Sequence, residues 1–88
     1  MSELSALWQF PCAFPIKVMG RQGEAFEFAV VQILRRHVPR LSEAAIQRRD
    51  SRQKHYAALT IVIDAQSREQ LDAIYQDLTA CEHVLMAL

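Results

Sequence analysis

Alternation of hydrophobic and polar positions predicts strands in several parts of the chain. Residues 14–19 place Phe14, Ile16 and Val18 on one face, with Pro15, Lys17 and Met19 on the other. Pro15 lacks a backbone donor, so we expect it near the start of this strand or at a gap in the strand pairing.

The clearest alternation covers residues 55–64, where Ala57, Leu59, Ile61 and Ile63 share one face. A polar turn at 50–53 joins this segment to a weaker strand at 44–49, which predicts a hairpin. The apolar segment 83–88 predicts a last strand that is held in the sheet. Its alternation would turn Val84, Met86 and Leu88 to one side and Leu85 and Ala87 to the other.

Two other segments carry hydrophobic residues at helical spacing. In residues 24–37 the predicted buried stripe ends at His37, and Pro39 stops the helix. The second helix begins at a capping box, with Ser67 as N-cap and Gln70 reaching back. The two stripes consist of Phe26, Val30, Ile33, Leu34 and His37 in the first helix, and Leu71, Ile74, Tyr75 and Leu78 in the second.

The resulting order is β-α-β-β-α-β, which predicts two right-handed β-α-β units in one four-stranded antiparallel sheet with both helices on one face. This is the α+β architecture called the ferredoxin-like α/β plait. We expect residues 13–88 to form this single domain and residues 1–12 to be an N-terminal lead-in.

Composition narrows the class of protein. The chain has 88 residues, 51% of them hydrophobic, which suits one small domain with a packed core. Ten basic residues balance ten acidic ones, so no overall field favours nucleic acid or anionic lipid. We see neither a membrane span nor a signal peptide and expect a cytoplasmic protein.

The residues with reactive side chains do not form a recognisable catalytic or metal-binding motif. Cys12 and Cys81 are far apart and belong to no CxxC pair, so we expect buried or half-buried thiols, and a disulfide or metal pair is the minor alternative. His37, His55 and His83 have no nucleophile at a telling spacing. An acylphosphatase-type site would pair a loop arginine such as Arg21 with an asparagine, and the chain contains no asparagine. We therefore expect no enzyme activity, no metal and no cofactor.

One end of the predicted sheet is a candidate ligand site. The loop after the first strand contains Gly20, Arg21 and Gly23, and the hairpin contributes Arg49 and Arg52. Backbone N–H groups at a helix start and nearby guanidinium groups can bind a carboxylate or phosphate. Glu24 and Glu27 at the same helix start oppose an anion, so a solvated rim of mutually paired charges is the competing interpretation.

The outer face of the sheet is a candidate interface, since its side chains are only partly polar. It would meet a second copy of the chain or another protein. Phe28 lies on the side of the first helix away from its buried stripe and is a further candidate contact. The predicted interface residues are Lys17, Met19, Phe28, Tyr56, Thr60 and Val62.

RNA binding is a less favoured alternative. Seven of the ten basic residues lie between Arg35 and Lys54, opposed only by Glu43 and Asp50. RNA-recognition domains of this fold stack bases on paired aromatic rings of the central strands, whereas the strand here offers Tyr56 alone.

Several blocks of the sequence carry a resemblance to a known family. They are Phe10-Pro11, residues 14–20, Val30-Val31, Arg36-His37 with Pro39, residues 56–63, Leu78, and residues 84–88. With these blocks, above all Lys17-Val18-Met19-Gly20 and the Met86-x-Leu88 ending, the chain resembles the YbeD family of small bacterial proteins of unknown function. The resemblance covers nearly the whole chain. It implies a ferredoxin-like fold similar to the ACT regulatory domains of amino-acid metabolism, and it supplies no catalytic residues.

Two functional hypotheses follow. The first is a non-enzymatic regulatory module that binds a small carboxylate-bearing metabolite, as ACT domains do. The second is a protein–protein adaptor without a small ligand, which uses the outer sheet face or Phe28.

Overall fold

The computed structural model of the chain describes residues 9–51 and 55–88, and it has the predicted order of elements. Each helix and the central strands lie where the hydrophobic pattern places them. Their bounds are β1 Cys12–Arg21, α2 Glu24–His37, the 3-10 turn η1 Glu43–Ala45, β2 Ile46–Asp50, β3 Tyr56–Ala65, α3 Arg68–Thr79 and β4 Val84–Ala87.

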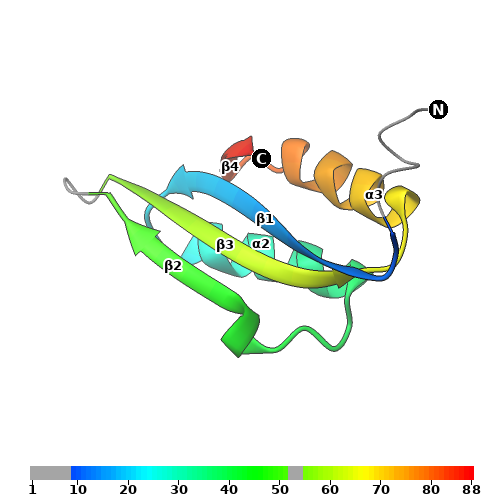
Figure 1. The fold of residues 1–88 in the computed structure, drawn as a ribbon. Helices are drawn as coiled ribbons and strands as arrows, with labels where there is room; N and C mark the ends of the chain where they lie inside the picture. Colours follow the sequence, from blue (N-terminus) through cyan, green and yellow to red (C-terminus); the bar gives the residue numbers. More distant parts are fainter. Residues whose placement is uncertain (1–8, 52–54) are drawn as a thin grey trace.

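The four strands form one antiparallel sheet in the spatial order β2-β3-β1-β4. β1 and β3 lie in the centre and pair along their whole length, from Cys12 opposite Ala65 to Arg21 opposite Tyr56. Helices α2 and α3 pack side by side against one face, and no helix from residues 9–51 and 55–88 lies on the other face (Figure 1). The prediction of a ferredoxin-like α+β plait is confirmed.

Hydrophobic side chains from the inner sheet face and both helices form the core. Ile16 and Val18 of β1 and Leu59 and Ile61 of β3 are almost fully buried. The predicted helical stripes meet them, with two exceptions: His37 and Tyr75 are only half-buried and lie at the edge of the core. The buried residues are Ile16, Val18, Phe26, Val30, Ile33, Leu34, Leu41, Ala57, Leu59, Ile61, Ile63, Ala65, Leu71, Ile74 and Leu78.

Strand boundaries differ from the sequence prediction, by one residue at each end of β3 and by more in β1 and β2. β1 is longer than residues 14–19 because both ends continue their pairing with β3. Residues 44 and 45, predicted as the start of a strand, instead belong to η1, in which the Ala45 N–H donates to the Ser42 carbonyl. Pairing with β3 begins only at Ile46, so β2 is a short edge strand.

Pro15 lies at a gap in the strand pairing, as expected. Lys17 exchanges two backbone hydrogen bonds with Leu88, so the odd-numbered backbone groups of β1 point toward the β4 edge. β4 pairs with residues 18–20, and Pro15 lies beyond Leu88 along that edge. The missing N–H of Pro15 therefore removes no ladder bond to β4.

β4 does not alternate as predicted, because its pairing with β1 contains a bulge. Gly20 lies opposite Val84 and Met19 opposite Met86, so Leu85 is the extra residue. Val84 and Ala87 consequently both pack against the core, while Met86 and Leu88 share the outer face with Met19 and Lys17.

The capping box of α3 forms with a small change of partner. The Ser67 hydroxyl accepts from the Gln70 N–H at 3.1 Å, as predicted. The side-chain oxygen of Gln70 accepts from the N–H of Gln66, one residue before the cap, at 2.8 Å. Its amide nitrogen donates to the His37 carbonyl at 3.2 Å, which ties the start of α3 to the end of α2.

Candidate binding surfaces

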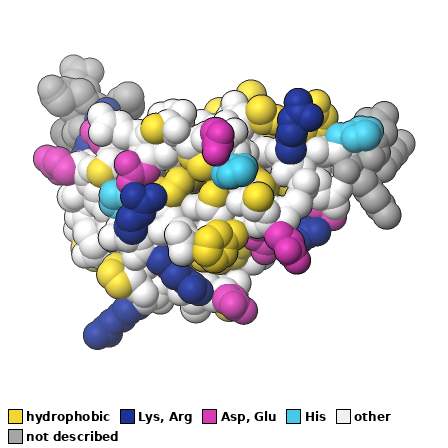
Figure 2. Space-filling model, turned by 180° about the vertical axis from the view of Figure 1, so that it is seen from behind, with side chains coloured by type: hydrophobic (Ala, Val, Ile, Leu, Met, Phe, Trp, Pro, Cys, Tyr) yellow, Lys and Arg dark blue, Asp and Glu magenta, His cyan; other side chains and the backbone are white. Residues whose placement is uncertain are grey.

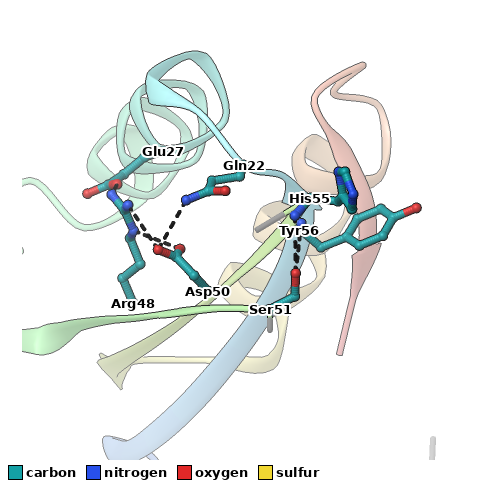
Figure 3. A network of polar contacts seen from close by, with 7 residues as sticks. All are labelled: Gln22, Glu27, Arg48, Asp50, Ser51, His55 and Tyr56. Carbon is teal, nitrogen blue, oxygen red and sulfur yellow. Dashed lines mark hydrogen bonds and ion pairs between the residues drawn. The ribbon is translucent and has the colours of Figure 1, made fainter. Parts of the chain in front are cut away.

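The loop after β1, the start of α2 and the β2–β3 hairpin meet at one end of the sheet, as predicted (Figure 3). The Gln22 N–H donates to the His55 carbonyl, and its side chain donates to Asp50 at 3.1 Å. The Ser51 hydroxyl accepts from the N–H groups of His55 and Tyr56, both at 3.2 Å. This end of the molecule is therefore held by side chains from three separate segments.

Arg48 is the centre of the charged cluster at this end. It donates to Glu27 at 2.9 Å and to Asp50 at 3.1 and 3.3 Å (Figure 3). Hydrogen bonds to Asp50 and then to Glu27 raise the pKa of Arg48 above its ordinary value. Because Arg48 is already paired with two carboxylates, this part of the rim matches the competing prediction of a rim of mutually paired charges.

The predicted ligand residues lie in three different environments. Gly20 is buried, and a Cβ atom there would clash with the Phe26 ring and come within 2.5 Å of the His83 carbonyl oxygen. Gly20 therefore permits close packing between β1, α2 and the start of β4. Arg49 pairs with Ala58 on the outer sheet face, and Arg52 lies outside the described residues.

Arg21 and Gly23 do share a surface hollow, of about 170 Å³, beside the start of α2. Gly23 has a positive φ of 145° and no atom within 4 Å of its Cβ position, so backbone conformation rather than packing selects glycine here. His83 and Glu82 lie on the opposite wall, 3.9 Å apart. The hollow thus presents one arginine and one histidine to an anion, whereas the carboxylate of Glu82 would repel an anion. Its lining residues are Arg21, Gln22, Gly23, Ala25, Phe26, Glu82, His83 and Leu85.

The outer sheet face presents several partly exposed hydrophobic side chains. Met19, Tyr56 and Val62 are 40%, 44% and 45% exposed. Met86 and Leu88 of the β4 edge extend the same face and are 49% and 64% exposed. Met19 occupies the middle, since it lies opposite Ala58 on one side and opposite Met86 on the other.

Polar groups are spread around this hydrophobic surface. Lys17 and Thr60 lie opposite each other, Arg49 lies beside Ala58, and Asp64 lies toward the far end of β3. Met19, Arg49 and Tyr56 line a shallow hollow of about 130 Å³ together with Asp50, Ser51, Ala57 and Ala58.

Met86 and Leu88 belong to the outer sheet face although neither is among the interface residues predicted from the sequence. The alternation along residues 84–88 indicated that Met86 and Leu88 share one face, but the bulge at Leu85 determines which face of the sheet that is.

Phe28 projects from the helical layer, as expected, and is 65% exposed. Figure 2 shows this side of the molecule, with exposed hydrophobic side chains among basic and acidic ones. A hollow of about 390 Å³ lies beside Phe28 and is lined by Phe28, Val31, Gln32, Arg35 and Arg36.

The histidine and cysteine side chains considered for catalysis have surroundings that serve the structure of the fold. His37 Nε2 lies 2.7 Å from Asp77 Oδ2 and links α2 to α3, a contact that periodicity did not suggest. Cys12 and Cys81 are half-buried free thiols. Within residues 9–51 and 55–88 no group of three metal-ligating side chains is present, and neither helix is long and apolar enough to cross a membrane.

Comparison with known proteins gives the family. A family model described as "Protein of unknown function (DUF493)" matches residues 5–88. The chain belongs to this family. A "UPF0250 protein" from Chromobacterium violaceum is 40% identical over 86 residues, covering 98% of this chain and 97% of the relative. "UPF0250 protein NE1487" from Nitrosomonas europaea is 39% identical over the full length of both chains. The resemblance to the YbeD family noted from the sequence is thereby confirmed.

A solved structure supports the fold. The solution structure of protein HP0495 from H. pylori has a TM-score of 0.71 to this chain, covering 92% of this chain and 85% of that one. The sequence identity is 11%, so the likeness concerns the fold alone. The names of these relatives and of the HP0495 structure assign no activity.

Proposed function

We propose that this DUF493-family chain is a non-enzymatic regulatory module that acts by binding another protein through its outer sheet face. The observation that carries the proposal is the set of five partly exposed hydrophobic side chains on the side of the sheet opposite α2 and α3. They are Met19, Tyr56, Val62, Met86 and Leu88.

The chemistry of this face suits a protein partner better than a small molecule. Tyrosine and methionine are among the residues enriched in the buried centres of protein interfaces, and polar groups at the rim fix orientation. Here Met19 lies centrally and Tyr56 lies at the hairpin end of β3, and Lys17, Arg49 and Asp64 lie around them. The hollow on this face measures only about 130 Å³, below the 300–1,000 Å³ typical of small-molecule sites.

The regulatory part of the proposal comes from architecture. The ferredoxin-like plait is also the fold of ACT domains, which act through contacts and ligands instead of catalysis, and this likeness is an analogy of fold. A cytoplasmic location fits such a role, since Cys12 and Cys81 are both free thiols.

A substitution on the outer sheet face tests the proposal. Val62→Arg places a charge among the exposed hydrophobic residues, and Gln76→Arg adds the same charge on the exposed side of α3. Each protein is immobilised and exposed to extract of its own source cells. We expect a stoichiometric protein partner on the wild type and on Gln76→Arg and a loss of at least tenfold on Val62→Arg. Equal retention by all three proteins, or no partner on any of them, would contradict the proposal.

A second candidate function is the binding of a small carboxylate in the hollow beside Arg21 and Gly23. The specific observation in its favour is that Arg21, His83 and the N-terminus of α2 border one hollow. A ligand present at about 100 times its dissociation constant would add roughly 2.7 kcal/mol to the free energy of unfolding. A thermal-shift panel of amino acids and organic acids, repeated with Arg21→Gln, tests it. An unchanged melting temperature across the panel would remove this candidate.

A further inference from the structure

The exposed side of α2 carries a short stripe of residues that is complementary to itself. Glu24, Phe28, Val31 and Arg35 follow one another at spacings of four, three and four residues. At 3.6 residues per turn this spacing places all four on one line along the helix. Glu24, Phe28 and Arg35 are exposed and Val31 is half-buried, so the line faces away from the core.

The order of these residues makes the stripe complementary to the same stripe of a second copy that runs antiparallel to it. If a second α2 lies antiparallel on a twofold axis between residues 29 and 30, Phe28 falls opposite Val31 of the second copy. Glu24 then falls opposite Arg35 of the second copy, and symmetry repeats both contacts. The four-three-four spacing is also that of the a and d seam through which paired helices pack.

The surface beside the stripe has room for this contact. The hollow lined by Phe28, Val31, Gln32, Arg35 and Arg36 measures about 390 Å³. In the antiparallel arrangement it is the place that the second copy's phenylalanine enters, because that ring lies opposite Val31. Among the described residues no ion pair engages Glu24 or Arg35, whereas Glu27 is already bound to Arg48.

We propose that α2 forms a homodimer interface in which Phe28 packs against Val31 and Glu24 pairs with Arg35 across a twofold axis. α2 lies on the face of the sheet opposite the outer sheet face. A dimer of this kind would therefore leave two outer sheet faces free on opposite sides. The interface is small, since a helix of 14 residues supplies most of it, and we expect a dimer that dissociates at low concentration.

Charge reversal tests the pairing directly. Sedimentation velocity is measured between about 1 μM and 1 mM protein for the wild type, Glu24→Arg, Arg35→Glu and the double variant. Each single reversal sets like charges against each other twice and should weaken the dimer at least tenfold. The double variant restores opposite charges and should dimerise like the wild type. The two single variants, when mixed, should form a heterodimer in preference to either homodimer.

Matched controls distinguish pairing across α2 from a general effect of charge and from a dimer through the sheet. Arg40→Glu makes the same charge change at an exposed residue beyond the end of α2, and Arg40 does not line the hollow. It should dimerise like the wild type, as should Val62→Arg on the outer sheet face. Circular dichroism of every variant checks the fold. A wild type that stays monomeric at 1 mM would overturn the proposal, as would single reversals that dimerise as tightly as Arg40→Glu. Dissociation by Val62→Arg alone would assign the dimer to the sheet face instead.

Discussion

Replacing Gly20 by alanine decides whether this glycine serves packing or ligand access. The added Cβ atom would meet the Phe26 ring and would lie 2.5 Å from the His83 carbonyl oxygen. The ring is 3% exposed and packs in the core, where it also borders the hollow beside Arg21, so it can move only at the cost of core contacts. The carbonyl is backbone, just before β4, and shifts only if β4 shifts with it.

The expected cost follows from these two obstacles. One added carbon in a packed core costs about 1–3 kcal/mol when neighbours must move. Since one neighbour is backbone and the other a buried ring, we expect the upper end, about 3 kcal/mol. That is a large share of the roughly 4–13 kcal/mol expected for a domain of this size. With a urea m-value of about 1 kcal/mol/M, the unfolding midpoint would fall by about 3 M.

Gly23→Ala is the matched control for this experiment. No atom lies within 4 Å of its Cβ position, so only the strain of a positive φ remains, and we expect a loss of about 1 kcal/mol. Combining Gly20→Ala with Phe26→Leu should recover part of the loss, with a coupling energy of at least 0.5 kcal/mol. Urea unfolding of Gly20→Ala that differs from the wild type by less than 0.5 kcal/mol would refute the packing role of Gly20.

Three further substitutions test other contacts. Ser67→Ala removes the hydroxyl that accepts from the Gln70 N–H and should lower the free energy of unfolding by about 1 kcal/mol in urea titrations; no loss would contradict the cap. Arg48→Ala should destabilise the protein more in dilute buffer than in 1 M salt, since its two carboxylate partners are exposed to screening; a salt-independent effect would argue against the charged cluster. Burial raises the pKa of Tyr75, whose hydroxyl donates to the Leu88 carbonyl at 2.7 Å. The neutral form of Tyr75 is thus favoured in the folded state, so the free energy of unfolding should have its full value below about pH 10 and fall above it. Tyr75→Phe should lose less of this free energy between pH 9 and pH 11, and a pH profile identical to that of the wild type would refute the effect.

Periodicity was enough to predict the architecture, because each buried face repeats at the spacing of its element. β3 shows this most clearly, since Leu59, Ile61 and Ile63 are buried and alternate with neighbours that are half-buried or exposed. Local exceptions were harder to foresee. The bulge at Leu85 depends on how β4 meets Gly20, which is a long-range contact absent from the sequence pattern.

The sequence predicted which segments meet at the candidate site, but not which side chains pair there. The meeting of the loop, helix start and hairpin follows from topology, and the structure places Gln22, Arg48 and Asp50 together there. Which arginine binds the carboxylates depends on the face that each residue of β2 occupies. Arg48 points toward α2 and reaches Glu27, whereas Arg49 lies on the outer sheet face.

The most direct test of the proposed function is the capture of a protein partner by the outer sheet face. Wild-type protein, Val62→Arg and Gln76→Arg are compared in the same extract, with the captured proteins quantified against the bait. We expect a stoichiometric partner on the wild type and Gln76→Arg and at least tenfold less on Val62→Arg. The same amount of that partner on Val62→Arg as on Gln76→Arg would contradict the proposed function.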